Sequence, residues 1–219
     1  MGDELCKLCL NIKDELSSET TFQVGIDNLL LLRRRLFNIL SQLKADLCRE
    51  DFNAMPFIGA DGFHSKSIAY SIWHIFRIED IVVHTLINCD EQIFFSDNYQ
   101  EKIGSPIITT GNELVGQQIA DFSLTLDLDA LYQYASSVKA STDKMLKNLI
   151  FDDLKRNVAA EDKLRLESLE VVSLSENARW LIDYWCSQDL HGLILMPFSE
   201  HWLAHIFACM TIRNKLYSK

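Results

Sequence analysis

Apolar residues recur three and four positions apart along four long stretches of the chain, and this spacing places them on one face of an α-helix. The first stretch extends from Thr21 to Cys48. The second, from about Lys66 to Cys89, is apolar nearly all round, so we expect it to be the most buried helix. The apolar positions of the first stretch include Leu29, Leu32, Leu36, Ile39, Leu40 and Leu43.

A third long helix is predicted over residues 130–149. Asp127 or Asp129 can cap its N-terminus, because a carboxylate there accepts a hydrogen bond from an unpaired backbone N–H. The residues expected to face inward include Tyr132, Ala135, Val138, Met145 and Leu149.

The last long helix is predicted to follow Gly192 and to end near Tyr217. Pro197 is expected in its first turn, where the missing N–H leaves no hydrogen bond broken. Shorter helices are predicted for Asn112–Phe122 and for Asn177–Ser187, which carries two tryptophans.

Between these helices the patterns favour irregular structure. Asp51–Asp61 and Asn98–Gly111 contain proline and glycine and are predicted to be loops. Phe151–Glu176 is polar and charged, so we expect a flexible or peripheral segment there. No repeat or linker divides the chain, and residues 1–219 are predicted to form a single domain.

Composition agrees with an all-α fold. The chain has only 3 prolines and 8 glycines in 219 residues, whereas all-β folds use many of both in their turns. Four long helices with additional short ones predict a four-helix bundle.

The charge balance restricts the partners. With 21 basic and 31 acidic residues the net charge is −10, which repels phosphate backbones and argues against nucleic acid as a partner. The basic run Arg33 to Arg35 lies within a predicted helix, where pairing with carboxylates is the expected role. No stretch reaches the roughly 20 apolar residues that span a bilayer, and the N-terminus lacks the apolar core of a signal peptide, so a cytoplasmic protein is expected.

In a reducing cytosol the six cysteines are expected to be free thiols. Cys6 and Cys9 form a single CxxC motif. Without a second such motif, we interpret the pair as apolar positions of an N-terminal helix rather than as a redox or metal site.

His201 and His205 are the most informative pair in the sequence. On a helix their separation by four residues places both rings on one face, with Cβ atoms about 5–6 Å apart, close enough to share a metal ion. Two hydrogen-bonded core histidines are the alternative interpretation. Trp202 stands where a metalloprotease HExxH motif has its glutamate, and no histidine has a glutamate three residues before it, as di-iron bundles require.

His74 is a third candidate ligand, because it lies in the middle of the most apolar predicted helix. Three other histidines compete with it. His64 precedes that helix and is placed to cap or orient it. His84 is rotated about 80° around the helix from His74. His191 lies at a helix boundary, where a surface or capping role is expected.

The segment SIAYSIWHIFRIEDIVVHTLI resembles the second helix of DinB-like proteins (the DinB/YfiT group), and LILMPFSEHWLAHIFACMTIRNKL resembles the last helix of that family. The resemblance implies a four-helix bundle with a long crossover connection. It also implies a metal site made by His74, His201 and His205, holding nickel or zinc, and a homodimer. Members with known activities include thiol-dependent S-transferases and a thiol-dependent isomerase.

Two functions are therefore considered. The first is a metal-dependent enzyme, a thiol S-transferase or a hydrolase acting on a small molecule, in which the open metal position lowers the pKa of a low-molecular-weight thiol or of water. Tyr70, one turn before His74, is the candidate to orient the substrate or donate a proton, although a packing tyrosine is the alternative. The second is a non-catalytic helical dimer, a stress-response binding or scaffold protein with a vestigial metal site.

The RIED stretch that follows His74 has a structural interpretation. Ionic groups on a buried helix need partners, so we expect Arg77 and Glu79 or Asp80 to form ion pairs, with Glu79 meeting the arginines at 33 to 35.

Overall fold

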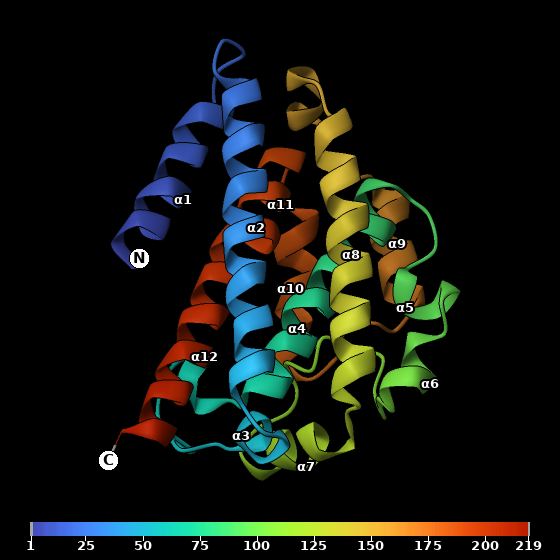
Figure 1. The fold of residues 1–219 in the computed structure, drawn as a ribbon. Coiled ribbons are helices and arrows are strands. Elements are labelled where there is room, and N and C mark those ends of the chain that lie inside the picture. The colour runs from blue at the N-terminus through green and yellow to red at the C-terminus, as the bar shows by residue number, and fades with distance from the viewer. Residues whose placement is uncertain (1, 219) are drawn as a thin grey trace.

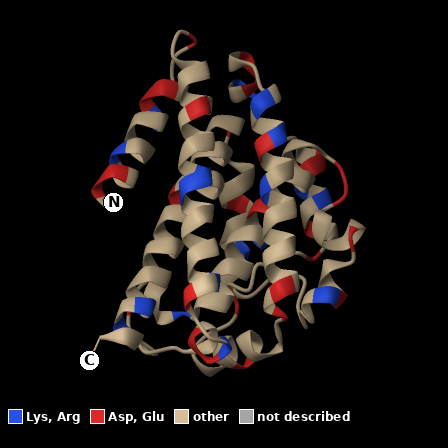
Figure 2. Ribbon diagram, in the orientation of Figure 1, with Lys and Arg blue, Asp and Glu red and all other residues tan. Residues whose placement is uncertain are grey.

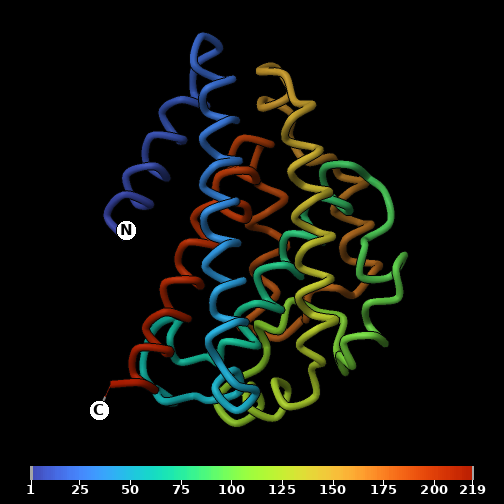
Figure 3. Tube along the Cα trace, viewed as in Figure 1, coloured from blue at the N-terminus to red at the C-terminus, as the bar shows by residue number. Residues whose placement is uncertain are grey.

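The computed structural model describes residues 2–218 and has an all-α fold (Figure 1). The four longest predicted stretches all form helices, and they pack around one core in an arrangement compatible with a four-helix bundle. Their bounds are α2 (Phe22–Asp46), α4 (Ile68–Asp80), α8 (Leu128–Asn148) and α12 (His201–Tyr217). In Figure 3, α2 and α8 run in opposite directions, with α4 behind them.

The helix that begins with α4 is the most buried, as predicted. Every residue of α4 is buried, and so is every residue of the π-helical segment Ile81–Ile87 that continues it. Ser67 caps its N-terminus by accepting a hydrogen bond from the backbone N–H of Tyr70 at 3.0 Å. The expected capping role of His64 was therefore wrong, because the shorter serine side chain reaches the free N–H directly.

The third long helix begins as one of the two predicted caps requires. Asp127 accepts a hydrogen bond from the backbone N–H of Ala130 at 2.8 Å, whereas Asp129 lies inside the first turn and pairs with Lys44.

The last helical stretch begins earlier than predicted, at Leu190. It consists of α11 (Leu190–Leu195), the π-helical segment Met196–Glu200 and α12. Pro197 was expected in the first turn and lies instead in the π-helical segment. A proline has no N–H to donate to the preceding turn, which accounts for the local change in hydrogen bonding.

On composition alone, the helical stretch Leu190–Tyr217 could cross a membrane, contrary to the expectation from sequence. Its most apolar 18-residue window has a mean hydropathy of 1.3, but 61% of that window is buried in the protein. In Figure 2 the ribbon of α12 is free of charge until it approaches the C-terminus, and the neighbouring α2 and α4 pack against it. A window that is mostly buried is compatible with a core helix of a soluble protein, which passes the same test of length and composition.

The N-terminal helix α1 (Gly2–Leu16) packs against α2. Cys9 is buried on its inner face, Cys6 is half-buried, and all six cysteines are free thiols. The interpretation of the CxxC motif as part of a packed helix is confirmed.

Two predicted loops contain short helices, which are too short for apolar periodicity to reveal. The helix α3 (Arg49–Asn53) lies at the start of the first loop and α6 (Tyr99–Ile103) lies inside the second, while α5 (Ile93–Ser96) precedes the second loop. The predicted helix Asn112–Phe122 begins later, after Gly116, because the φ of 51° at Gly116 is incompatible with a right-handed helix. This helix is α7 (Gln117–Thr125).

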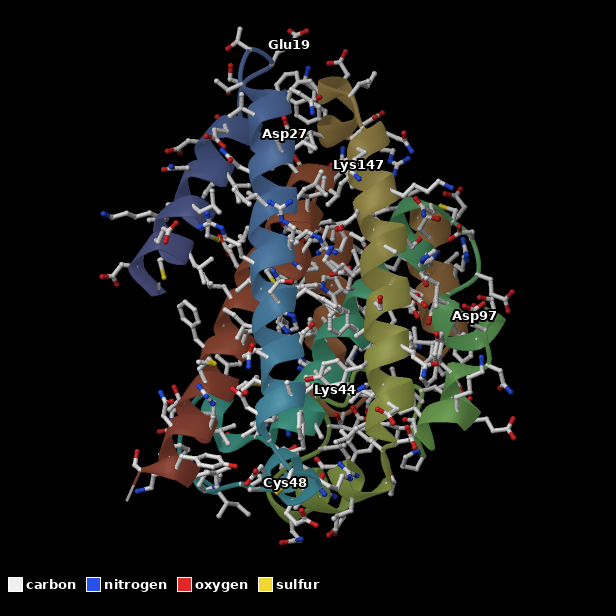
Figure 4. The ribbon with its side chains drawn as sticks, viewed as in Figure 1. Glu19, Asp27, Lys44, Cys48, Asp97 and Lys147 are labelled. Carbon is white, nitrogen blue, oxygen red and sulfur yellow. The ribbon has the colours of Figure 1, made fainter. Side chains whose placement is uncertain are left out.

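The polar segment 151–176 is peripheral, as expected, but it is packed. It contains a 3-10 turn at Phe151–Lys155 and the helix α9 (Ala160–Ser168). Leu166 and Val171 from this segment are fully buried. The adjoining α10 (Glu176–Cys186) matches the predicted short helix. Charged side chains such as Glu19, Asp97 and Lys147 project outward from the surface of the molecule (Figure 4).

Candidate metal centre

His74, His201 and His205 converge in the core, where α4 packs against α12. One ligand atom from each ring can be chosen so that all three lie within 4.8 Å of one another. The ring centroids of His201 and His205 are 4.5 Å apart, as the spacing of four residues on one helix face predicts. Each histidine is at most 5% exposed.

The imidazole nitrogens of this cluster are short of hydrogen-bond partners. Within residues 2–218, Nδ1 of His201 and both ring nitrogens of His205 are buried without a partner. A buried polar atom left unpaired costs roughly 1–3 kcal/mol, so the protein alone leaves this cluster unsatisfied. One divalent ion could bind one nitrogen from each of the three rings, and the donor set fits such an ion.

The ring of His74 is held in one tautomer. Its Nδ1 lies 2.6 Å from the carbonyl oxygen of Thr110, and since a carbonyl can only accept, Nδ1 carries the proton and donates. The Nε2 lone pair is therefore free for an ion, and the hydrogen bond fixes the orientation of the ring.

All three histidines are uncharged near neutral pH. Burial lowers the pKa of His74 from 6.5 to about 4, and it lowers the pKa of His201 and His205 well below 6.5. Because a metal binds only the neutral imidazole, the ligands are ready for an ion without prior loss of protons.

The loop over residues 109–113 supports His74. Gly111 has a φ of 77°, and a Cβ added there would lie 3.1 Å from Cε2 of Tyr70 and 3.2 Å from Cζ3 of Trp73. Only glycine combines this backbone conformation with so close an approach. The neighbouring carbonyl of Thr110 is thereby set against His74.

Tyr70 stacks on the ring of His74, with centroids 5.4 Å apart and planes 13° from parallel. Its hydroxyl donates to the carbonyl oxygen of Gly111 at 2.9 Å, and burial raises its pKa above the ordinary value of 10. The contacts of Tyr70 thus hold the loop and the ligand ring in place. Its role toward a substrate stays a prediction.

Two further residues lie beside the cluster, and no pattern in the sequence indicates them. Phe63 packs edge-on against His205, with centroids 4.7 Å apart, and is 49% exposed. Lys66 is half-buried, which lowers the pKa of its ammonium group, and its charge in turn lowers the pKa of His74 and His205. Among residues 2–218 no carboxylate pairs with Lys66. Both residues precede α4, and only the tertiary fold brings them to the histidines.

The other histidines lie elsewhere. His64 packs against the ring of Phe57, and His84 is bound to Asp90. His191 lies inside α11 rather than at a C-terminal cap, because the helix begins at Leu190.

The predicted ion pairs of the RIED stretch are confirmed. Glu79 binds Arg33 with a nitrogen–oxygen distance of 2.7 Å, and both side chains are fully buried. Arg77 lies 3.5 Å from Asp80. The indole N–H of Trp202 donates to Glu79 at 2.7 Å, so the residue between the two α12 histidines serves this ion pair rather than the metal centre.

No protein-family model and no curated protein matches the sequence. Among solved structures, the chain is similar to the crystal structure of a conserved protein from Enterococcus faecalis, with a TM-score of 0.61 and 15% sequence identity. The similarity covers 87% of this chain and 96% of the other. At this identity it shows the fold alone.

Proposed function

We propose that the protein is a metal-dependent enzyme that binds one divalent ion, nickel or zinc, through His74, His201 and His205. The observation that carries the proposal is the set of buried ring nitrogens left without partners where the three rings meet. Three neutral ligands leave one coordination position for a substrate or thiol, which is the arrangement of a catalytic rather than a structural site.

The chemistry supplied by the ion would be Lewis-acid activation of a thiol or of water. The residues around the cluster suit an anionic reactant. The ammonium group of Lys66 lies 5.6 Å from the centroid of the Tyr70 ring and has no carboxylate partner among residues 2–218, so it attracts a thiolate or a carboxylate. The exposed face of Phe63 offers apolar contact to the rest of the reactant. The stacked ring of Tyr70 and the carbonyl of Thr110 hold His74 in place while a reactant binds.

We propose further that the chain is a distant DinB-like protein, a small-molecule thiol S-transferase or hydrolase, and a homodimer in the cytoplasm. The motif around His74, the MP turn before His201 and the convergence of the three histidines support this relationship.

Metal binding is tested first, on protein purified without a histidine tag. Elemental analysis is expected to find close to one equivalent of metal, and the chelated protein should take up zinc or nickel in calorimetric titration. His205→Ala should lose stoichiometric binding while keeping its helical circular dichroism. His64→Ala, a histidine outside the cluster, is the matched control and should bind like the wild type. Failure of the wild type to bind either metal, or full binding by His205→Ala, would refute the proposed site.

Activity is tested next on the zinc- and nickel-loaded protein. Conjugation of a chloro-aromatic compound or an epoxide to low-molecular-weight thiols should be detectable and should disappear in His205→Ala. If metal binds but neither conjugation nor hydrolysis is observed, the non-catalytic binding protein becomes the better explanation. Light scattering on the same samples gives the oligomeric state, and a monomer would contradict the dimer.

A further inference from the structure

We propose that Ser141, His84 and Asp90 form a second, metal-independent reactive site in which Ser141 is an acyl-accepting nucleophile. The Oγ of Ser141 lies 3.2 Å from Nε2 of His84, and Nδ1 of the same ring lies 2.5 Å from Oδ1 of Asp90. The carboxylate accepts the proton of Nδ1, which leaves Nε2 free to accept the proton of Ser141. This is the relation of nucleophile, base and orienting carboxylate that activates a serine.

The chain holds the histidine and the carboxylate together by its backbone. His84 lies in the π-helical segment Ile81–Ile87, and Cys89 adopts a φ of 57°, so the chain turns back on itself. The backbone N–H of Asp90 then donates to the carbonyl oxygen of His84 at 2.8 Å. Local π-helical turns and residues in left-handed conformations recur at functional sites.

Two arginines from distant parts of the sequence fix this turn. Arg156 donates to the carbonyl oxygen of Ile87 at 2.8 Å, and Arg165 donates to the carbonyl oxygen of Asp90. Both arginines bind backbone oxygens rather than the carboxylate, so the carboxylate stays directed at His84. A second carboxylate, Asp80, lies 3.9 Å from Nε2, but it accepts hydrogen bonds from Tyr134 and from two backbone N–H groups.

A cavity of about 370 Å³ opens beside the site, and Ser141 and Asp90 both line it. Its size suits a small acyl ester. The backbone N–H groups of α8 are bonded within the helix, so any donors to a developing oxyanion must be side chains. Lys144 follows Ser141 by about one turn on the same helix face and also lines the cavity. Its ammonium group is on a side chain long enough to approach a developing oxyanion, which makes Lys144 the candidate donor.

The reaction that follows is acyl transfer to Ser141. Its oxygen forms a bond to the carbonyl carbon of the ester, and its proton passes to Nε2 of His84. When the bond to the leaving alcohol breaks, that alcohol takes the proton from Nε2. Water then repeats the sequence on the acyl-serine, releasing the acid and restoring the serine.

The experiment uses a fluorophosphonate probe and p-nitrophenyl acetate on the full chain in the presence of a chelator. The probe should label Ser141, with loss of fluoride, as located by peptide mass spectrometry. Ser141→Ala should abolish labelling, and His84→Gln should slow it by about 10²-fold or more. Ser136→Ala, an exposed serine on the same helix, is the matched control and should leave labelling and p-nitrophenol release unchanged.

Asp90→Asn provides a variant on an exposed turn, so a loss of labelling there cannot be attributed to a disrupted core. It should also slow the reaction. Absence of label at Ser141 in the wild type, or labelling of His84→Gln and Asp90→Asn at the wild-type rate, would overturn the proposal. Because the chelator removes any metal, the outcome is independent of the three-histidine centre.

Discussion

Two buried polar groups lie close together in this protein and differ in how completely they are satisfied. Both draw on α4 and α12. One is the ion-pair cluster of Arg33, Glu79 and Trp202, and the other is the cluster of three histidines. In the first, each carboxylate oxygen of Glu79 receives two hydrogen bonds, from Arg33 and Thr142 on one side and from Arg33 and Trp202 on the other.

The histidine cluster lacks such a complete set of hydrogen bonds. His205 has no hydrogen bond at either ring nitrogen within the described chain, although it is only 2% exposed. Glu79 is fully hydrogen-bonded within the protein and stabilises the fold, whereas the histidine cluster gathers several unpartnered ring nitrogens at one place, as a ligand site requires. On this comparison the ion pair is structural, and the three histidines form a group that could hold a metal ion.

The largest expected effect follows from breaking the closed cluster. Glu79→Ala leaves the fully buried guanidinium of Arg33 with Asp143 as its remaining carboxylate partner, and the free energy of unfolding should fall by about 3–5 kcal/mol. Urea denaturation measures the change. Glu4→Ala removes the exposed partner of Arg35 and should leave the midpoint unchanged. If the two variants were equally stable, the cluster would not be the structural element described.

The sequence predicted the three histidines and the pairing of Glu79 with the arginines at 33 to 35, but not the hydrogen bonds that Trp202 and Thr142 donate to Glu79. Periodicity located α2, α4, α8 and α12, because long amphipathic patterns survive in any packing that buries them. It could also place His201 and His205 on one face, since that relation is local to one helix.

The residues that support the histidines could not be predicted from the sequence, and the reason is physical. Thr110 and Gly111 lie in a loop whose backbone conformation depends on the rings of Tyr70 and Trp73, and no pattern within the loop encodes that contact. The π-helical segment around Pro197 likewise has no periodic signal, so the start of the last helical stretch was misplaced. The Ser141 and His84 pair joins two helices across 57 residues of sequence.

The second prediction concerns acid stability of the metal-free protein. The unfolded chain has histidine pKa values near 6.5, while burial lowers that of His74 to about 4 and those of His201 and His205 below the ordinary value as well. The unfolded state therefore binds more protons as the pH falls below 6.5, and stability present above that pH is lost. For His74 alone the loss at pH 5 is about 2 kcal/mol.

Unfolding free energies of chelated protein between pH 7 and pH 5 test this. Acidic groups elsewhere also respond to pH, so the informative quantity is the difference from His205→Leu, which lacks one buried histidine. The unfolding free energy of His205→Leu should fall less steeply over this range, because unfolding of this variant takes up as much as one proton fewer than unfolding of the wild type. Identical slopes would mean that His205 is protonated in the folded protein, against the picture of neutral ligands.

The smallest expected effect concerns the loop over residues 109–113, which supports His74 but contributes no ligand to the histidine cluster. In Gly111→Ala the new Cβ presses on Tyr70 and Trp73, so the Thr110 carbonyl shifts from His74 and zinc affinity should fall about 10-fold. Gly59→Ala is the matched control, because Gly59 has a φ of 82° but nothing within 4 Å of an added Cβ. Both variants carry the same backbone penalty of about 1–2 kcal/mol, and only the first changes the surroundings of His74. A zinc affinity reduced equally in both would show that backbone strain alone matters, and an affinity unchanged in Gly111→Ala would show that His74 needs no support from the loop.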